Sequence, residues 1–384
     1  MSTRSLVLSI FLLTIGCEGG EDSGEALRDS VLDEDSDTDH GAFSAPQVEI
    51  IIAGADGLNP NGDGSGVVTV QAATNEAVNY TFDLGDGTIV ADASGEVEHT
   101  YTHEGTQTYI LAVTAEAEDG AQATWTGSVT VRRSTSHHPR LVWADEFDGD
   151  GAVDSEKWHH QVFAPSDGRW FNGELQHYTD RVENSFQSDG TLKIVARKES
   201  YTTQGVTLDY TSARLNSRFI FTYGRVDVRA KLPVAGGTWP AIWTLGANIN
   251  EPGNAFGDTY GSVSWPACGE IDIMEQTGGD KASTLAYFHW GNTETSAYET
   301  EGSAISNPDS TDEFHIYSLV WDEAAMRIYV DDQLVHELAN TVTRPYDNPH
   351  YLLLNIAMGG NLGGAVPGDF TDATLEIDYV RVYQ

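Results

Sequence analysis

Apolar and polar residues alternate along much of the chain. Residues 225–230 read Arg-Val-Asp-Val-Arg-Ala, and a period of two places successive side chains on opposite faces of a β-strand. Similar short runs recur after residue 140, at Leu192–Ala196, Gly224–Ala230, Ile316–Trp321, Arg327–Val330, Tyr351–Ala357 and Thr374–Tyr383. This region contains no convincing amphipathic helix pattern. We therefore predict a large all-β sandwich over residues 141–384.

A second group of β-like runs lies nearer the N-terminus, within residues 46–133. These runs are Val48–Ala53, Val67–Ala72, Val78–Phe82, Val97–Thr102, Thr108–Ala115 and Ala123–Val131. Asp, Asn and Gly separate them, which is typical of the turns in a small antiparallel sandwich. The polar segment 134–140 is predicted to be a linker between the two β modules.

The first 45 residues predict an export segment and a tether. Arg4 precedes an apolar run that ends before Gly16-Cys17, the pattern of a signal peptide over 1–17 and too short to span a bilayer. Thr14-Ile15-Gly16-Cys17 resembles a bacterial lipoprotein box, which implies a lipid on Cys17 and an outer-membrane lipoprotein at the cell surface; plain secretion is the alternative. Residues 18–45 are rich in Asp, Glu, Ser and Gly, so we expect a disordered acidic tether.

Charge and cysteine content narrow the possible partners. The 20 Lys and Arg are outnumbered by 59 Asp and Glu, giving a net charge of -39. This balance argues against nucleic acid and against an anionic membrane surface, so the lipid anchor is the only membrane contact expected. Once Cys17 carries lipid, Cys268 has no disulfide partner, and we expect it to be a small buried side chain. We expect a monomer that binds an uncharged ligand.

The segment Glu270–Glu275 carries three acids in a strand-like pattern. In a regular strand Glu270 and Asp272 share one face, whereas Glu275 points to the opposite face, into the core. A lone buried carboxylate is costly. A β-bulge near Ile273 and Met274 would shift the parity and return Glu275 to the face of the other two acids.

Three acids on one face repel one another, which raises at least one pKa. Cleavage of a glycosidic bond needs this arrangement, with one carboxylate ionised and another carboxyl protonated. An edge strand with solvated acids is the plainer alternative.

The run Glu270-Ile271-Asp272-Ile273-Met274-Glu275 resembles the bulged-strand signature of glycoside hydrolase family 16. Nearly all of residues 141–384 take part in the resemblance, through Trp143–Phe147, Asn172–Thr179, Gly237–Trp243, Leu354–Gly360 and Ile377–Gln384. The stretch from Asn172 is of the laminarinase type, although Gly173 stands where a second Asn is usual.

The resemblance implies a β-jelly-roll whose concave sheet forms a long cleft. By position, Glu270 is the nucleophile, Glu275 the general acid/base, and Asp272 the residue that hydrogen-bonds the nucleophile. His289 falls where the family often has a histidine near the acid/base residue. A core histidine is the alternative for His289.

Aromatic and polar residues of the matched stretches are implied to contact sugar. Trp239 and Trp243 are placed in the cleft, where indole rings cover the apolar C–H faces of sugars; by spacing alone, a core role for one of them is equally open. Asn172 and Arg214 are implied to contact sugar hydroxyls. Trp265 either lines the cleft floor or packs in the core.

The predicted substrate is a neutral β-glucan. Abundant acids and few Lys disfavour sulfated galactans, which would need basic partners. The laminarinase-like stretches imply internal cleavage of β-1,3 bonds in laminarin-type glucan, with mixed β-1,3-1,4-glucan as a second substrate. Agar hydrolysis, transglycosylation and β-glucan binding without hydrolysis are alternatives, and the loop Ala247–Val263 could block one end of the cleft.

Two further features follow from resemblance. Phe82–Gly87, His99–Tyr101 and Glu104-Gly105 resemble the PKD family of immunoglobulin-like modules, which implies a spacer or a weak binder over 46–133. Glu146, the backbone carbonyl of Gly190 and Asp378 match the family's ligands for a structural calcium ion, which takes oxygen ligands. The alternative is that they are ordinary surface groups.

Overall fold

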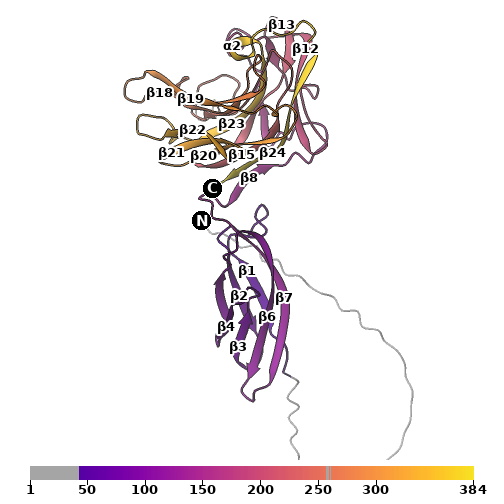
Figure 1. The fold of residues 1–384 in the computed structure, drawn as a ribbon, viewed down its shortest axis with the longest axis vertical. Coiled ribbons are helices and arrows are strands. Elements are labelled where there is room, and N and C mark those ends of the chain that lie inside the picture. The colour runs from indigo at the N-terminus through magenta and orange to yellow at the C-terminus, as the bar shows by residue number, and fades with distance from the viewer. Residues whose placement is uncertain (1–42, 257–258, 260) are drawn as a thin grey trace, which may run out of the picture. The chain divides into compact units, whose positions relative to one another are not determined.

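The computed structural model describes residues 43–256, 259 and 261–384 (Figure 1). The predicted signal peptide 1–17 lies outside the described residues, as does the predicted tether up to residue 42. Among the helices in the described part of the chain, none has the length and apolar character needed to cross a membrane.

The N-terminal module consists of antiparallel strands in two sheets. The smaller sheet is ordered β1 (Gln47–Ile52), β2 (Val67–Ala73) and β5 (Glu96–Thr100). The larger sheet is ordered β4 (Ile89–Asp92), β3 (Ala77–Asp83), β6 (Gly105–Ala117) and β7 (Gln122–Arg133). Alternate residues such as Val70, Phe82 and Val113 are fully buried between the sheets. All six runs predicted here are strands, and only the four-residue β4 was not predicted.

In the described part of residues 141–384, the strands again form two main sheets (Figure 1). The seven-stranded sheet is ordered β19 (Tyr298–Ser306), β18 (Ser283–Gly291), β17 (Glu270–Glu275), β16 (Thr238–Gly246), β23 (His350–Met358), β14 (Arg214–Phe221) and β9 (Trp158–His160). The ten-stranded sheet is ordered β10 (Gln176–Tyr178), β13 (Val206–Ser212), β12 (Thr191–Thr203), β24 (Asp372–Tyr383), β15 (Gly224–Lys231), β20 (His315–Trp321), β21 (Ala325–Val330) and β22 (Gln333–Ala339); β11 (Ser185–Ser188) pairs with β12, and β8 (Leu141–Asp145) pairs with β24. A short helix, α2 (Gly360–Gly363), follows β23.

The main core lies between these two sheets. On β15, Val226, Val228 and Ala230 are fully buried and alternate with partly exposed residues. They share one hydrophobic cluster with residues of the seven-stranded sheet such as Ile271 and Ile356. The alternation of the sequence therefore indicates which side of each strand faces the opposing sheet, and the predicted all-β jelly-roll sandwich is confirmed.

Strand β23 is buried on both faces. Leu352 and Leu354 belong to the main core, whereas Leu353 belongs to a second cluster with Ile249 and Cys268. Residues of the loop after β16 thus cover part of the face that the seven-stranded sheet turns away from the main core. We call this outward side the cleft face. The burial of Cys268 agrees with its predicted role as a small core side chain.

Shortening Leu354 to alanine should lower the stability of the β-sandwich of residues 141–384 without changing its fold. Leu354 is 0 % exposed, and a Leu→Ala change in such a core lowers the free energy of unfolding by about 2–5 kcal/mol. Denaturant unfolding followed by tryptophan fluorescence measures this change. Leu334→Ala, at a side chain that is 48 % exposed, is the matched control and should stay within about 0.5 kcal/mol of wild type. Equal losses in both variants would contradict this account of the core.

Candidate active site

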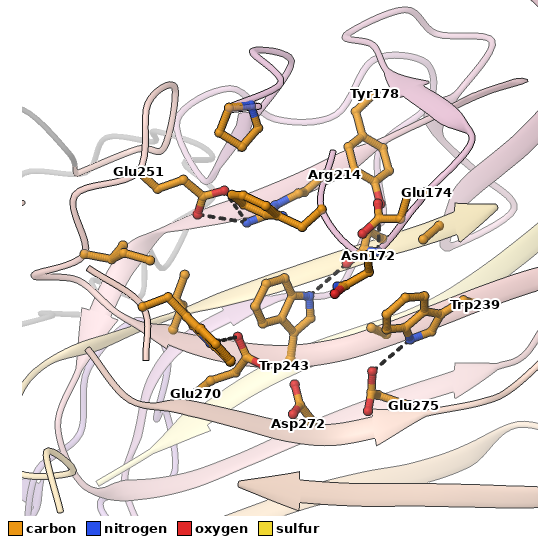
Figure 2. Close-up of a pocket in the computed structure, with 18 of the residues that line it drawn as sticks. Asn172, Glu174, Tyr178, Arg214, Trp239, Trp243, Glu251, Glu270, Asp272 and Glu275 are labelled. Atoms are coloured by element: carbon orange, nitrogen blue, oxygen red, sulfur yellow. Dashed lines mark hydrogen bonds and ion pairs between the residues drawn. The ribbon is translucent and has the colours of Figure 1, made fainter. Parts of the chain in front are cut away.

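A cleft of about 550 Å³ lies on the cleft face of the seven-stranded sheet (Figure 2). Its walls come from β14, β16, β17 and β23, and from loop residues near positions 172 and 251. Seven residues predicted to act in catalysis or sugar binding line it: Asn172, Arg214, Trp239, Trp243, Glu270, Asp272 and Glu275. The eighth, His289, lies beside Asp272. The structure therefore brings together side chains separated by more than 100 positions in the sequence.

The predicted β-bulge is present in β17. Ile242 of β16 pairs with Met274, but the next residue, Trp243, pairs with Asp272, so Ile273 is the extra residue. The register with β18 shifts over the same segment. Ile273 and Met274 both point into the main core, and Glu275 consequently faces the cleft with the other acids.

The three acids form a row along β17, and each has a nearby polar partner. Trp265 Nε1 donates to Glu270 Oε2 at 3.2 Å. Trp239 Nε1 donates to Glu275 Oε1 at 2.8 Å. In the middle of the row, Asp272 Oδ2 lies 3.3 Å from Nε2 of His289. The histidine therefore belongs to the site rather than to the core.

The row is arranged to hold protons. Burial, followed by repulsion from Asp272, raises the pKa of Glu270 well above its ordinary value. Burial and the charge of Glu275 raise the pKa of Asp272, and burial also raises the pKa of Glu275. Because these neighbouring carboxyls resist ionising together, one can donate a proton while another stays charged.

The same groups are the one cluster of potential metal ligands in the described part of the chain. Single ligand atoms of Glu270, Asp272 and His289 all lie within 4.8 Å of one another. This compactness shows how closely the acids and the histidine converge. Glu270 and Asp272 line the cleft and His289 lies beside Asp272, so these groups are equally suited to acid–base chemistry on a bound ligand.

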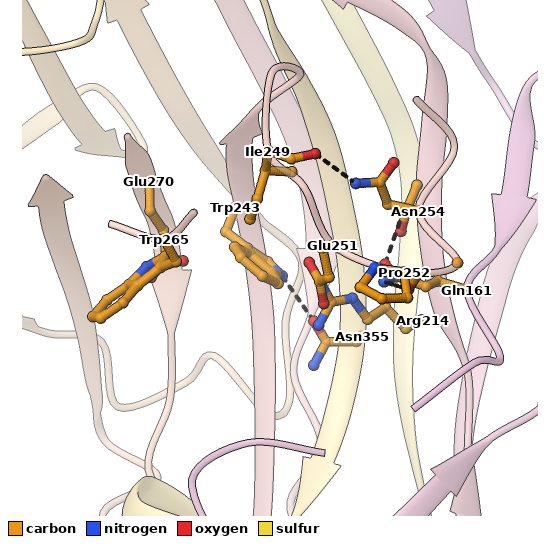
Figure 3. A network of polar contacts seen from close by, with 12 residues as sticks. Gln161, Arg214, Trp243, Ile249, Glu251, Pro252, Asn254, Trp265, Glu270 and Asn355 are labelled. Carbon is orange, nitrogen blue, oxygen red and sulfur yellow. Dashed lines mark hydrogen bonds and ion pairs between the residues drawn. The ribbon is translucent and has the colours of Figure 1, made fainter. Parts of the chain in front are cut away.

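Arg214 lies at the other end of the cleft, and its charge is paired inside the protein. Its guanidinium lies 5.1 Å from the ring of Trp170 and 4.9 Å from the ring of Trp243. Its Nη2 donates to both carboxylate oxygens of Glu251, at 3.3 and 3.2 Å (Figure 3). Glu251 belongs to the loop expected to limit the cleft, so this ion pair anchors that loop against β14.

A chain of hydrogen bonds fixes Trp243. Its Nε1 donates to Oδ1 of Asn355 at 2.8 Å, and Asn355 Nδ2 donates to the hydroxyl of Tyr178 at 3.1 Å. That hydroxyl donates to Oε2 of Glu174 at 3.3 Å, which also accepts from Gln176 Nε2 at 2.7 Å. Both tryptophans predicted in the cleft face it, since Trp239 and Trp243 are half-buried residues on the same side of β16.

Four site residues were not assigned from the sequence: Glu174, Tyr178, Glu251 and Asn355. Three of them lie inside stretches that already carried the family resemblance, and Glu251 lies in the loop singled out as a possible barrier. Their position within these segments is the sequence signal that could have identified them. Their hydrogen-bond and ion-pair partners could not be identified in this way, because these contacts join distant parts of the chain.

Asn172 lies on the rim of the cleft and has a left-handed backbone, with φ of 59°. Its Oδ1 accepts from Asn361 Nδ2 at 3.4 Å, a contact between the loop before β10 and helix α2. This side chain is exposed, as expected of a residue that could contact a sugar hydroxyl.

The predicted calcium ligands lie beside the middle of β24, where Asp378 is located, but their carboxylates already have partners. Glu146 accepts two hydrogen bonds from Arg381, at 2.8 and 2.7 Å. Asp378 accepts one from Arg229 at 2.6 Å. Each carboxylate would have to leave its arginine to coordinate an ion together with the carbonyl of Gly190. Calcium binding here stays a prediction.

Comparison with known proteins places this site in a family. Residues 172–381 match the model of glycosyl hydrolases family 16, and residues 50–132 match the PKD domain. The β-glucanase of Rhodothermus marinus is 39 % identical over an aligned length of 273 residues, and the match covers 66 % of this chain and 88 % of that protein. LamAcat from Zobellia galactanivorans is 61 % identical with a TM-score of 0.63, over 64 % of this chain and 97 % of that structure. A LamA variant in complex with laminaritriose and laminaritetraose is 60 % identical with a TM-score of 0.64, over 64 % and 100 %.

Replacing Glu174 with glutamine should change how stability depends on pH. Burial raises the pKa of Glu174 from 4.5 to about 7, so the folded protein keeps a proton that the unfolded chain has released. The stability from this group is full below pH 4.5 and is lost as pH rises towards 7. A difference of this size corresponds to about 3 kcal/mol. Denaturant unfolding at several pH values should therefore show that the free energy of unfolding of Glu174→Gln increases relative to that of wild type as pH rises from 4.5 to about 7.

The exposed acid Glu294 provides the control for this experiment. Glu294→Gln makes the same carboxyl-to-amide change at an exposed side chain outside the cleft, and its unfolding is measured at the same pH values. The acids on β17 contribute equally to the pH dependence of unfolding in wild type and in Glu174→Gln. The difference in free energy of unfolding between these two proteins therefore reports the contribution of Glu174 alone. Parallel stability curves for the two proteins would contradict the assignment.

Proposed function

Because this chain belongs to family 16 of the glycosyl hydrolases, we propose that it cleaves internal β-1,3 bonds of laminarin-type glucan with retention of configuration. The observation that carries the proposal is the bulge in β17, which turns Glu270, Asp272 and Glu275 towards one cleft. The support from relatives is the β-glucanase of R. marinus and the LamA complex with laminari-oligosaccharides.

In the proposed first step, Glu270 attacks the anomeric carbon of the bound sugar. The bond from that carbon to the glycosidic oxygen breaks, and Glu275 gives its proton to the departing oxygen. In the second step Glu275 takes a proton from water, the water oxygen bonds to the anomeric carbon, and the Glu270 carboxylate leaves. Two inversions at the same carbon restore the original configuration.

Asp272 and His289 are proposed to control the charge between the two glutamates. The Asp272 carboxyl lies in the acid row between them, and the imidazole of His289 lies within 3.3 Å of it. As negative charge moves from Glu270 to the substrate and then appears on Glu275, these groups can adjust the proton and hydrogen-bond balance of the row.

The cleft suits a neutral sugar chain. Of the described residues that line it, Arg214 is the one with a guanidinium or ammonium group, and that charge is paired with Glu251. A sulfated galactan would need unpaired cations. The half-buried rings of Trp239 and Trp243, which line the cleft, provide the apolar surface that sugar C–H groups require. Mixed β-1,3-1,4-glucan fits the same features and is the proposed second substrate.

The proposals for the rest of the chain rest on sequence. We propose export through residues 1–17, lipid attachment at Cys17 and display at the cell surface through the tether 18–45. The PKD-type module is proposed to be a spacer that holds the catalytic module away from that surface, and the protein is proposed to act as a monomer.

Removing the nucleophile should abolish hydrolysis. Glu270→Ser is expected to lower the release of reducing ends from laminarin by on the order of 10³-fold or more, and added azide should restore turnover by attacking the anomeric carbon in place of Glu270. Glu294→Gln, at an exposed acid outside the cleft, should retain wild-type activity. Full activity of Glu270→Ser would reject this nucleophile, whereas β-glucan binding without hydrolysis by wild type would identify a binding protein instead.

Running the assay on laminarin, mixed-linkage glucan and agar with resolved product sizes tests the substrate.

The configuration of the first product provides an independent test of mechanism. Proton NMR during early hydrolysis of a laminari-oligosaccharide should show the β-anomer first, followed by slow mutarotation, because the double displacement retains configuration. Initial appearance of the α-anomer would show a single displacement and would remove Glu270 from the role of nucleophile.

A further inference from the structure

The end of β17 is joined to β16 by an incomplete hydrogen-bond ladder. Glu275 pairs with Ala241, and the next residue, Gln276, donates its backbone N–H to Pro240 O at 3.3 Å. A regular antiparallel pair would exchange a second bond in the opposite direction, but proline has no N–H to donate. The strand end that carries the proposed general acid therefore depends on other contacts for its position.

Lys281 provides such contacts from the turn between β17 and β18. Its ammonium group donates to Thr238 Oγ1 at 2.8 Å, to Thr238 O at 3.3 Å and to Gln276 Oε1 at 3.0 Å. Thr238 directly precedes Trp239, and Gln276 directly follows Glu275. The N–H groups of one ammonium thus join the neighbours of both partners in the hydrogen bond from Trp239 Nε1 to Glu275 Oε1 (Figure 2).

The oxygens that accept from this ammonium are oriented by partners of their own. Thr238 Oγ1 gives its proton to Ala235 O at 2.7 Å, which leaves its lone pairs for Lys281. Gln276 Nε2 donates to the carbonyl of Lys281 at 3.1 Å and to Ser310 Oγ at 3.2 Å, so the amide oxygen is the end that faces the ammonium. Thr238 and Gln276 are both 0 % exposed. The acceptors are therefore fixed parts of the packed interior.

Keeping Lys281 charged at this position is unfavourable by itself. Burial lowers the pKa of Lys281 from 10.5 to about 8. Its three acceptors are neutral oxygens, and a neutral side chain would avoid the desolvation of a charge. What the lysine contributes is the geometry of three hydrogen bonds from a single group.

We infer that Lys281 is a positioning residue for the general acid and holds Glu275 and Trp239 in the alignment that delivers a proton to the departing glycosidic oxygen. The inference rests on the proposed function and extends it, because Lys281 is not among the described residues that line the cleft. Proton transfer by a positioned side chain contributes about 10²–10⁴-fold to a rate, and misplacement of that side chain loses part of this factor.

The experiment compares two substrates that differ in their need for a proton. A β-1,3-linked glucose hexasaccharide has a poor leaving group and depends on the general acid. The 2,4-dinitrophenyl β-glycoside of the β-1,3-linked disaccharide releases a stable phenolate, which departs without protonation. Lys281→Met keeps the aliphatic stem and removes the ammonium. It should lower kcat/KM for the hexasaccharide about tenfold and leave kcat/KM for the dinitrophenyl glycoside within about twofold of wild type.

Three further variants calibrate this comparison. Glu275→Ala removes the general acid itself and should show the same difference between the substrates in a larger form. Thr238→Val keeps the shape of the side chain and removes its hydroxyl acceptor, so it should reproduce the effect of Lys281→Met to a smaller degree. Lys198→Met removes an exposed lysine of β12 in the ten-stranded sheet and should leave both substrates at wild-type rates.

Each outcome decides for or against the inference. Equal loss on both substrates by Lys281→Met, or loss on neither, would overturn it. A thermal melt that matches wild type shows that this variant is folded; if it is not folded, Thr238→Val decides, and the absence of a substrate difference there overturns the inference. If Glu275→Ala shows no difference between the substrates, Glu275 is not the general acid and the proposed mechanism itself fails, a result distinct from a failure confined to Lys281.

Discussion

The catalytic face of this protein depends on one extra residue in β17. A carboxylate buried in the core without partners is strongly unfavourable, and regular alternation would place Glu275 there. With Ile273 and Met274 both directed into the main core, the strand buries two consecutive apolar side chains and returns the glutamate to the cleft. Hydrophobic burial thus provides the driving force that aligns three mutually repelling acids.

A second constraint acts at the other end of the cleft. The residues after β16 carry their own small core, in which Ile249 packs with Leu353 and Cys268. This packing places Glu251 against Arg214, whose guanidinium lies between two indole rings. The loop is thereby held both by apolar contacts and by a buried ion pair, and removing one partner of such a pair leaves an uncompensated buried charge. The shape of the cleft is therefore determined by packing on the same sheet that carries the acids.

Much of this architecture could be predicted from sequence because it depends on local pattern. Alternation predicted the strands, and the parity of Glu270, Asp272 and Glu275 predicted the bulge before any pairing was known. The contacts of Arg214 could not be predicted in this way, since Glu251 lies in an irregular loop 37 positions away. The hydrogen bond from Asn355 to Tyr178 spans 177 positions and depends on the final order of strands. The arginine partners of Glu146 and Asp378 could not be predicted for the same reason. Each arginine lies far in sequence from the acid that it pairs with.

The internal pairing of Arg214 has a consequence for the medium in which the protein works. Dissolved ions screen exposed charges over about 8–10 Å at moderate ionic strength, and they act much less on buried pairs. The protein as a whole carries a net charge of -39, so its colloidal behaviour responds to salt. Recognition of an uncharged polymer by stacked rings and neutralised groups has no such long-range component. The affinity for the polymer is therefore independent of the strongly negative surface charge. Salt concentration changes the solubility of the protein rather than its affinity for the polymer.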